Sequence, residues 1–521
     1  MSGLNNGDTQ KIIDQVKTYI KKNAPENDKE LLSIFAQRYF TAAPIEDIKD
    51  RPIEELYNIM LSHWQFMTVR APGESKIRIF NPTQEKDGWE SSHTIIQLSH
   101  DDIPFLVDSI RMVINRYGWQ IHTIIHFGGL KLIRDKFHHV TGIVQPGVAD
   151  DEALSEAPIY IEIDRLTDEN DMNELKADIE RVLADVRASV VDWRKMDARI
   201  EDCLRDLEKS PPSLNTAEVE ESRDFLRWLI NNNFTFLGAR DYKLIGNGTS
   251  RALQLIPGSG LGVLREEVSG TMTKTYSELP PQARKMALSD DILIIAKTNT
   301  QSTVHRRAYT DYIGVKQYNQ KGELIGERRF IGLYTSTAYH SSPRQIPFLR
   351  HKVDKIIKEL EFPPDSHDGK EAVHILETLP RDDLFQASHE ELMAMTMAII
   401  QLKERKIVRL LVRRDAYNRY FSCLVYVPSD IFTTDLANAM QELLMKAFKG
   451  LESSYTIYFS ESVLSRIHFL IRVNPKAHLE YNIDEIENNL SALSRSWNDR
   501  LKEEMVFGVG LNDTPLTYKD Q

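Results

Sequence analysis

A group of polar residues at 99–102 has the chemistry to bind a small zwitterion. Ser99, His100, Asp101 and Asp102 follow an apolar run and precede a helical pattern. Free backbone N–H groups at a helix start suit a carboxylate, and an aspartate can pair with an ammonium group. The alternative is that both aspartates cap the helix and His100 lies on the surface. We favour this structural alternative.

A second group combines arginines with tyrosines. It consists of Arg413, Arg414, Asp415, Tyr417, Arg419 and Tyr420. Such a set could hold an anion or an acidic partner surface, because the planar guanidinium group bonds carboxylates at two points. A charged hairpin loop and an interface with another domain are the alternatives, and the interface is the preferred interpretation.

A third group comes from a β-rich segment, with His305, Arg306, Arg307 and Asp311 close together and Arg328 and Arg329 further along the chain. These residues could line a sensor pocket. Alternation along strands makes it equally natural that they face solvent or form buried ion pairs.

A nucleotide-binding motif is the feature most needed for dehydrogenase chemistry, and the chain offers one weak candidate. Gly258, Gly260 and Gly262 have the spacing G-x-G-x-G, and Val263 stands where the next glycine would be expected. The following VLREEVSG is too short for the required helix, so a turn between strands is predicted. His389-Glu390 begins like a zinc-protease helix, but Met393 replaces the second histidine. We therefore predict no catalytic, cofactor-binding or metal-binding residue.

Composition limits the class of protein. The chain has 521 residues and a formal net charge of -12, which disfavours binding to nucleic acid. Its two cysteines, Cys203 and Cys423, are too far apart to suggest a disulfide framework or a zinc site. No apolar stretch approaches the roughly 20 residues of a membrane span, and no leader segment is recognisable. The expectation is a cytoplasmic protein that does not enter membranes.

Hydrophobic periodicity predicts an α+β protein of several domains. Residues 8–70 show helical spacing, with Pro25, Pro44 and Pro52 at the joints. Residues 92–190 follow the order β-α-β-β-α, with room for another strand at 139–144, which is the ferredoxin-like pattern. In its first helix Asp102 is the expected cap, Pro104 the first turn and Gly118 the stop. The last helix, expected from Asp171 to about Val190, continues as helix at 193–210 until Pro211 and Pro212 break it.

The rest of the chain contains a β-rich domain and a second α+β unit. Residues 234–339 contain six predicted strands, two of them joined by the turn NQKG. Helices are expected at 346–360 and 381–406, the second with a Ser388–Glu391 capping box. The β-α-β-β-α pattern then recurs, with strands expected at 406–415 and 420–428 before its first helix and a last helix at 483–502. The predicted domains are 1–85 (helical), 90–190, 191–232 (linker), 233–345, 346–404 (helical connector) and 405–505.

Several long blocks are similar to the N-terminal half of the large bacterial NAD-specific glutamate dehydrogenases. They include LSHDDIPFLVDSIRM (98–112), NFTFLGARDYKL (233–244), the segment 304–339, ILETLPRDDLFQ (375–386) and VRRDAYNRYFSCLVYVPSD (412–430). The resemblance is collinear over most of the chain. It implies two ferredoxin-like ACT units of the βαββαβ type, at 90–190 and 405–505, flanking a PAS-like domain. In ACT modules the junction at 99–102 often meets an amino-acid ligand.

The resemblance also implies a function. Members of this family oxidise L-glutamate to 2-oxoglutarate and ammonia with NAD, and their catalytic domain comes later in a much longer chain. We therefore expect a truncated, non-catalytic region that serves assembly or regulation, without a cofactor of its own. Its expected partners are other domains and subunits of the same dehydrogenase, and an amino-acid effector is a candidate ligand. The alternative is a freestanding amino-acid sensor built from ACT domains.

Overall fold

A computed structural model describes residues 5–145, 147–148, 150–209, 214–247, 250–265, 273–403, 405–459, 462–477 and 479–494. The chain divides into two compact units. The first contains residues 1–196, 260–266 and 301–309, and the second contains the remaining segments. Three predicted features fall partly or wholly outside the described residues. They are the strand expected at 260–266 after the glycine-rich turn, the linker prolines Pro211 and Pro212, and the helical residues 495–502.

The first unit begins with a helical layer, as predicted. Its helices are α1 (Asn5–Asn23), η1 (Glu26–Asp28), α2 (Lys29–Thr41), α3 (Ile45–Ile48) and α4 (Ile53–Met67). Pro25, Pro44 and Pro52 directly precede η1, α3 and α4. Proline suits these positions because the first N–H groups of a helix have no intrahelical acceptor. Aromatic side chains from α2 and α4, including Phe35 and Trp64, pack in the core beneath these helices.

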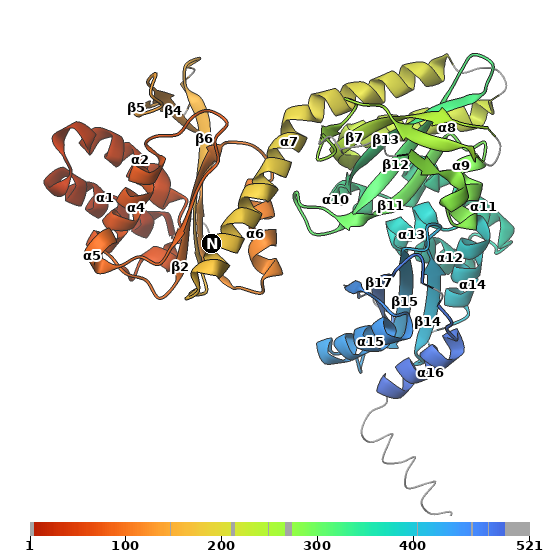
Figure 1. Ribbon diagram of the computed structural model, residues 1–521. Coiled ribbons are helices and arrows are strands. Elements are labelled where there is room, and N and C mark those ends of the chain that lie inside the picture. The colour runs from red at the N-terminus through yellow and green to blue at the C-terminus, as the bar shows by residue number, and fades with distance from the viewer. Residues whose placement is uncertain are drawn as a thin grey trace, which may run out of the picture. The chain divides into compact units, whose positions relative to one another are not determined.

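A sheet follows the helical layer. Its strands are β1 (Lys76–Phe80), β2 (Thr94–Asp101), β3 (Ile121–His126), β4 (Leu130–Arg134), β5 (Val140–Ile143) and β6 (Leu154–Ile163). The order is β1-β2-β6-β4-β5, and β3 pairs with the other half of β6. The connecting helices are α5 (Gln84–Asp87), α6 (Leu106–Arg116) and α7 (Glu169–Glu208). In Figure 1, α1, α2 and α4 lie on one side of this sheet, with α6 and the start of α7 on the other.

Three details of this unit differ from or extend the predictions. Residues 1–85 are not purely helical, since β1 lies within them and pairs with β2. The strand expected at 139–144 is present as β5. The helix expected from 171, and expected to continue through 193–210, is the single helix α7. Gly118 follows α6 with φ of 79°, the left-handed conformation that ends a helix, as predicted.

The second unit contains the β-rich segment. It starts with α8 (Thr216–Trp228) and the turn η2 (Leu229–Asn233). Strands β7 (Phe234–Ile245), β8 (Ala252–Leu255), β10 (Thr273–Thr275), β11 (Leu293–Gln301), β12 (Tyr309–Tyr318) and β13 (Leu324–Tyr334) follow, in the order β10-β8-β7-β13-β12-β11. The short elements η4 (Tyr276–Glu278) and α9 (Pro281–Leu288) connect β10 to β11, while β9 (Leu261–Gly262) belongs to the first unit. The turn predicted at 319–322 joins β12 to β13, with Gly322 at φ of 81°.

Helices connect this sheet to the last one. They are α10 (Ser336–His340), η5 (Pro343–Gln345), α11 (Leu349–Glu359), α12 (His367–Thr378), α13 (Arg381–Gln386) and α14 (His389–Ile400). The single helix predicted at 381–406 is wrong, because the chain breaks at Ala387 and restarts at Ser388. The predicted capping box explains the restart: Ser388 accepts from the Glu391 N–H, and the Glu391 carboxylate accepts from the Ser388 N–H.

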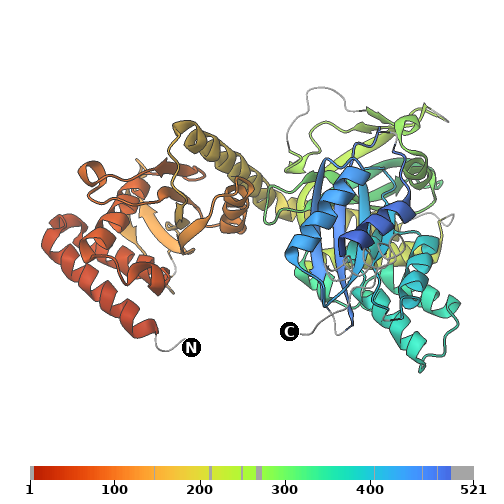
Figure 2. The same cartoon turned by 90° about the horizontal axis from the view of Figure 1, so that it is seen from below.

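The last sheet has four strands. They are β14 (Arg409–Arg414), β15 (Tyr420–Pro428), β16 (Glu452–Tyr458) and β17 (Leu464–Arg472), in the order β14-β15-β17-β16. Helices α15 (Thr434–Ala447) and α16 (Ile483–Ser494) cover one face of it, as Figure 2 shows. Buried residues of these helices, such as Met440 and Leu490, form one core with Phe421 and Phe469 of the sheet.

Both α+β units are built to one plan, which corrects the predicted βαββαβ order. In each, the first strand of the β-α-β-β-α pattern has a preceding strand as its outer neighbour: β1 beside β2, and β14 beside β15. The expected fourth strand therefore comes before the pattern rather than after it, giving ββαββα. The sheet orders β1-β2-β6-β3 and β14-β15-β17-β16 are equivalent. In the first unit the sequence pattern does not reveal this strand, because β1 lies within the segment predicted to be helical. In the second unit both strands before the helix, β14 and β15, match expected strands.

His63 gives the first unit a predicted pH dependence. Its buried ring donates from Nε2 to the Leu98 carbonyl (3.2 Å) and accepts from the Tyr39 hydroxyl (3.4 Å). Burial lowers its pKa from 6.5 to about 4. Below pH 6.5 His63 is therefore protonated in the unfolded chain but stays neutral in the folded protein. The free energy of unfolding consequently falls as the pH drops towards 4.

When the pH is lowered from 7 to 5, protonation of His63 in the unfolded state should reduce the free energy of unfolding by about 2 kcal/mol. Urea unfolding of the wild type and of His63→Gln at both pH values tests it. The wild type should lose about 2 kcal/mol more than the variant over this interval. Equal losses in the two proteins would show that His63 does not carry the effect.

Candidate functional site

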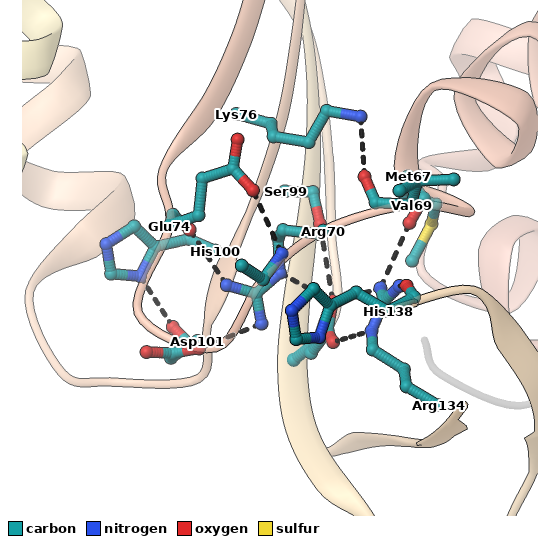
Figure 3. A network of polar contacts seen from close by, with 12 residues as sticks. Met67, Val69, Arg70, Glu74, Lys76, Ser99, His100, Asp101, Arg134 and His138 are labelled. Carbon is teal, nitrogen blue, oxygen red and sulfur yellow. Dashed lines mark hydrogen bonds and ion pairs between the residues drawn. The ribbon is translucent and has the colours of Figure 1, made fainter. Parts of the chain in front are cut away.

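Residues 99–101 lie in a buried network of charges centred on Arg70 (Figure 3). Arg70 follows α4, and its side chain is fully buried. It donates from Nε to Glu156 (3.0 Å), from Nη2 to Asp101 (2.8 Å) and from Nη1 to the Glu74 carbonyl (2.8 Å). Ser99 donates to the same Glu156 carboxylate at 3.4 Å. The network thus connects β2 and β6 to the segment that directly follows α4.

A second arginine completes the pairing of Glu156. Arg134 of β4 donates to both Glu156 oxygens, at 2.7 and 3.0 Å. It also donates to the carbonyls of Met67, Thr68 and His138. Since Met67 ends α4, this one side chain ties the helical layer to the sheet. A buried carboxylate needs such partners, because removing a charge from water without a counterion costs several kcal/mol.

His100 and Asp101 share a third arginine, Arg187 of α7. Arg187 donates to Asp101 at 2.7 Å and to Nε2 of His100 at 3.0 Å. His100 is buried and donates from Nδ1 to the Asp101 carbonyl, so its neutral form fits both contacts. Burial lowers the pKa of His100. Burial opposes the ionisation of Asp101, but hydrogen bonds from Arg187 and Arg70 outweigh it and lower the pKa of that carboxyl.

The predicted capping role of the aspartates is wrong. Helix α6 begins at Leu106, beyond Pro104, and the residue before it, Phe105, has φ of 71° and makes no side-chain cap. Asp102 instead accepts from the Gly129 N–H (2.7 Å) and the Ser155 hydroxyl (3.2 Å). The expectation that His100 lies on the surface is wrong as well. The amino-acid site proposed at 99–102 stays a prediction, and its four side chains are all engaged by protein groups.

The arginine-rich group at 413–420 lies in a second buried network, inside the second unit. Arg413 donates from Nε and Nη2 to Asp383 of α13, at 2.9 and 2.6 Å. Arg419 donates to the Lys297 carbonyl and Tyr420 to the Thr298 carbonyl, both on β11. This last sheet is therefore joined to the helical connector and to the β-rich sheet. The contacts are with other parts of the same unit, and the predicted interface with another domain of a full enzyme stays a prediction.

The remaining members of this group have local roles. The Tyr417 N–H donates to Asp415, and the Tyr417 ring lies 4.3 Å from the Arg419 guanidinium carbon. Arg414 lies 5.3 Å from the Phe421 ring centroid. Such cation–ring contacts contribute about 0.5–1 kcal/mol each at exposed sites and more where water is excluded. These contacts with Tyr417 and Phe421 orient the side chains of Arg419 and Arg414.

Ser422, His468 and Asp383 resemble a catalytic triad in composition only. Ser422 donates to Asp383 (2.8 Å) and lies 2.8 Å from Nε2 of His468. The serine therefore bonds the acid directly, and the same Nε2 of His468 lies 3.6 Å from Asp383, whereas a catalytic histidine contacts the acid and the serine through opposite ring nitrogens. The adjoining cavity is only about 10 Å³, the space of one water molecule. These residues form a buried structural chain of hydrogen bonds.

The third predicted group is divided by the fold. Asp311 pairs with Lys297 at 2.8 Å in the second unit, and Asp382 is 3.2 Å from the same ammonium group. Burial raises the pKa of Asp311, although Lys297 opposes that shift. This residue forms the buried ion pair that was one of the two alternatives to a sensor pocket.

His305 and Arg307 belong to the first unit. There they line a cavity of about 270 Å³ beside α6, together with Asp108, Arg111 and Arg116. The His305 N–H donates to Ser109 (3.0 Å), and its ring nitrogen is 3.3 Å from the Asp108 carboxylate. Of the predicted group, His305 and Arg307 therefore line this cavity, and Asp311 is not part of it.

The described residues offer no evident centre for dehydrogenase chemistry. Within the described ranges, no cluster of three histidine, cysteine or acidic residues could hold a metal ion. Gly258 has φ of 73° in the turn after β8, as predicted for a turn glycine, and Gly262 donates its N–H to Asp192. Residues 266–272, which would contain the helix of a nucleotide site, lie outside the described part. Among the described helices, none is long and apolar enough to cross a membrane.

Comparison with known protein families assigns the two ββαββα units. Residues 35–179 match the model of the glutamate dehydrogenase ACT1 domain, and residues 409–498 match that of the ACT2 domain. Residues 346–405 match the glutamate dehydrogenase helical motif 1. The chain therefore carries the ACT domains of a glutamate dehydrogenase, with the helical motif directly before the second one.

Similar curated proteins extend this assignment along the chain. The NAD-specific glutamate dehydrogenase of Halomonas elongata is 36% identical over 500 residues, which cover 96% of this chain and 31% of that protein. The Pseudomonas aeruginosa enzyme of the same name is 33% identical, over 95% of this chain and 30% of its own length. The Mycobacterium tuberculosis enzyme is 25% identical, over 84% and 26%. The chain belongs to the NAD-specific glutamate dehydrogenase family, and it spans less than a third of these relatives.

Proposed function

We propose that this chain is the non-catalytic assembly and regulatory region of an NAD-dependent glutamate dehydrogenase. The whole enzyme would convert L-glutamate, NAD and water to 2-oxoglutarate, ammonia and NADH, with NAD bound outside these residues. The supporting observation is the pair of ACT units, each with one face covered by α6 and α7 or by α15 and α16, and the other by a preceding helical segment. The charges buried in both units pair with one another, so they support a scaffold better than a reaction centre.

The proposed domain division follows the predicted one for the second ACT domain, at 405–505. The first ACT domain would extend from β1 (Lys76–Phe80) to about residue 190 rather than begin at residue 90, because β1 pairs with β2. Residues 233–345 would form the PAS-like domain. Its strand order β8-β7-β13-β12-β11 supports this, because the first and last strands of the segment are neighbours at the centre of the sheet. Residues 346–404 would serve as the helical connector that carries Asp383.

Assembly with other subunits is proposed to use the edge strand β16. Among the described residues it pairs on one side only, with β17, and an unpaired strand edge is a template for association. Leu451 and Phe459, just before and just after this strand, are 57% and 61% exposed. Large exposed apolar side chains at both ends of an open edge favour burial against a second copy of the chain.

Light scattering on the purified chain over a range of concentrations tests this assembly. We expect the wild type to associate and the double variant Leu451→Asp/Phe459→Asp to be monomeric, because two charges would have to be buried in the interface. Phe137→Asp, at a residue that is 65% exposed in the first unit, is the matched control and should associate like the wild type. A monomeric wild type at every concentration, or an associating double variant, would exclude this surface.

A further inference from the structure

We propose that a cavity between α1, α2 and the β4–β5 side of the first unit binds a small dicarboxylate. Its volume is about 430 Å³, and it is lined by side chains of both helices and by residues of β4 and the end of β5. Cavities of about 300–1,000 Å³ are typical of small-molecule sites. The inference needs only the fold of the first unit and does not depend on the proposed function.

Charge is the first reason for this assignment. Lys17, Lys21 and Arg38 line the cavity, and none of its described lining residues is acidic. This is unlike the networks around Arg70 and Arg413, where carboxylates pair with the arginines. Three cations facing one space without a counterion attract an anion, and a partly enclosed wall strengthens that attraction.

The hydrogen-bonding capacity of these cations is the second reason. Arg38 is half-buried and donates from one Nη to the carbonyls of Gly128 (3.2 Å) and Gly129 (3.5 Å), which holds the guanidinium group in place. Within the described residues, its Nε and other Nη have no hydrogen-bond partner, and neither has Lys21. Lys17 is held by the Gln37 amide oxygen at 2.5 Å. The cavity thus contains the guanidinium group of Arg38, held in position by its carbonyl contacts, and the ammonium group of Lys21, which can bind a ligand.

The apolar residues that line the cavity favour an organic dicarboxylate over an inorganic anion. Ile34, Leu130 and Ile143 line the same cavity. An inorganic phosphate would satisfy cations but leave this wall in contact with water. A dicarboxylate can place one carboxylate on Arg38 and the other on the α1 lysines, while its methylene groups cover the wall. Arginine binds a carboxylate at two points, which adds orientation to attraction.

The last turn of α1 provides a matched pair of variants. Lys21 and Lys22 both lie there and both interact favourably with the helix dipole. Only Lys21 lines the cavity. A purely helix-stabilising role would make the two positions equivalent, whereas a ligand site distinguishes them.

Titration calorimetry of the full chain with glutarate tests the proposal, with butyrate and inorganic phosphate as comparison probes. We expect glutarate to bind with a Kd below about 1 mM and butyrate at least about tenfold more weakly, because it lacks the second carboxylate. Lys21→Gln and Arg38→Gln should each raise the Kd about tenfold, and Lys22→Gln should leave it unchanged.

Three results would overturn the proposal: no heat from glutarate at millimolar concentration, tighter binding of phosphate than of glutarate, or equal weakening by Lys21→Gln and Lys22→Gln. Circular dichroism of each variant establishes that it is folded. Lys21 is exposed, so its variant keeps the test valid even if Arg38→Gln disturbs the packing of α2 on the sheet.

Discussion

Glu156→Ala is expected to destabilise the first unit by about 4 kcal/mol. The side chains of Glu156 and Arg70 are 0% exposed and that of Arg134 is 4% exposed, so removing the carboxylate leaves two buried guanidinium groups without their shared partner. Breaking one member of a buried ion pair costs far more than the pair contributes, because the remaining charge keeps its desolvation penalty. The loss of one buried carboxylate thus acts on β2, β4, β6 and the end of α4 together.

Hydrogen exchange resolved by peptide measures this effect unit by unit, which is necessary because a chain of several units need not unfold in two states. Peptides that cover β2 and β6 should lose protection, while those of the second unit should be unchanged. Glu180→Ala provides the control, since Glu180 is half-exposed on α7 and pairs loosely with Lys176 at 3.9 Å. Unchanged protection in Glu156→Ala would mean that the network does not hold the sheet and the helical layer together.

Asp383→Ala is expected to destabilise the second unit by about 3 kcal/mol or more. Asp383 is buried, and its carboxylate accepts from Arg413 and Ser422. Burial opposes its ionisation, but Arg413 and His468 outweigh this and lower its pKa. Its contribution is therefore present above the unfolded carboxyl pKa of about 4 and is lost as the pH falls through the lower folded value.

The consequence should appear at the junction of α13 with the last sheet. Peptides of β14 and β15 should exchange faster in Asp383→Ala at neutral pH, and the difference from the wild type should shrink on acidification. Asp430→Ala, which removes an exposed pair with Lys406, is the control and should have no measurable effect. A pH-independent difference would show that the variant acts through lost packing rather than through the charge.

The predictable part of the fold was the part with strong local periodicity. The helices at 5–67, the strands at 94–101 and 420–428 and the capping box at Ser388 follow from local spacing and chemistry. Strand β1 was missed because five residues beside a helical segment carry little periodic signal, and its identity depends on pairing with β2. In the second unit the order of strands and helices does follow from local pattern, but the pairing of these strands into the sheet order β14-β15-β17-β16 depends on long-range contacts.

The candidate sites also depend on contacts between residues that are far apart in the sequence, which local patterns do not reveal. Sequence composition draws attention to the residues at 99–101 and 413–420, but it does not identify their partners Arg70, Glu156, Arg187 and Asp383. Each partner comes from 30 or more residues away along the chain. One usable signal was available, since Glu156 stands in the apolar strand LSEAPIYIEI, where a buried acid requires a basic partner. The identity of that partner follows only from the fold.

The most direct test of the account is a glutamate-dependent assay of NADH formation by the purified chain, produced in a host that lacks glutamate dehydrogenase. A scaffold without a nucleotide site predicts no NADH formation above the rate without protein, at any concentration of L-glutamate or NAD. Saturable NADH formation that increases with the amount of chain would contradict the account, because it would place a complete dehydrogenase site within these residues.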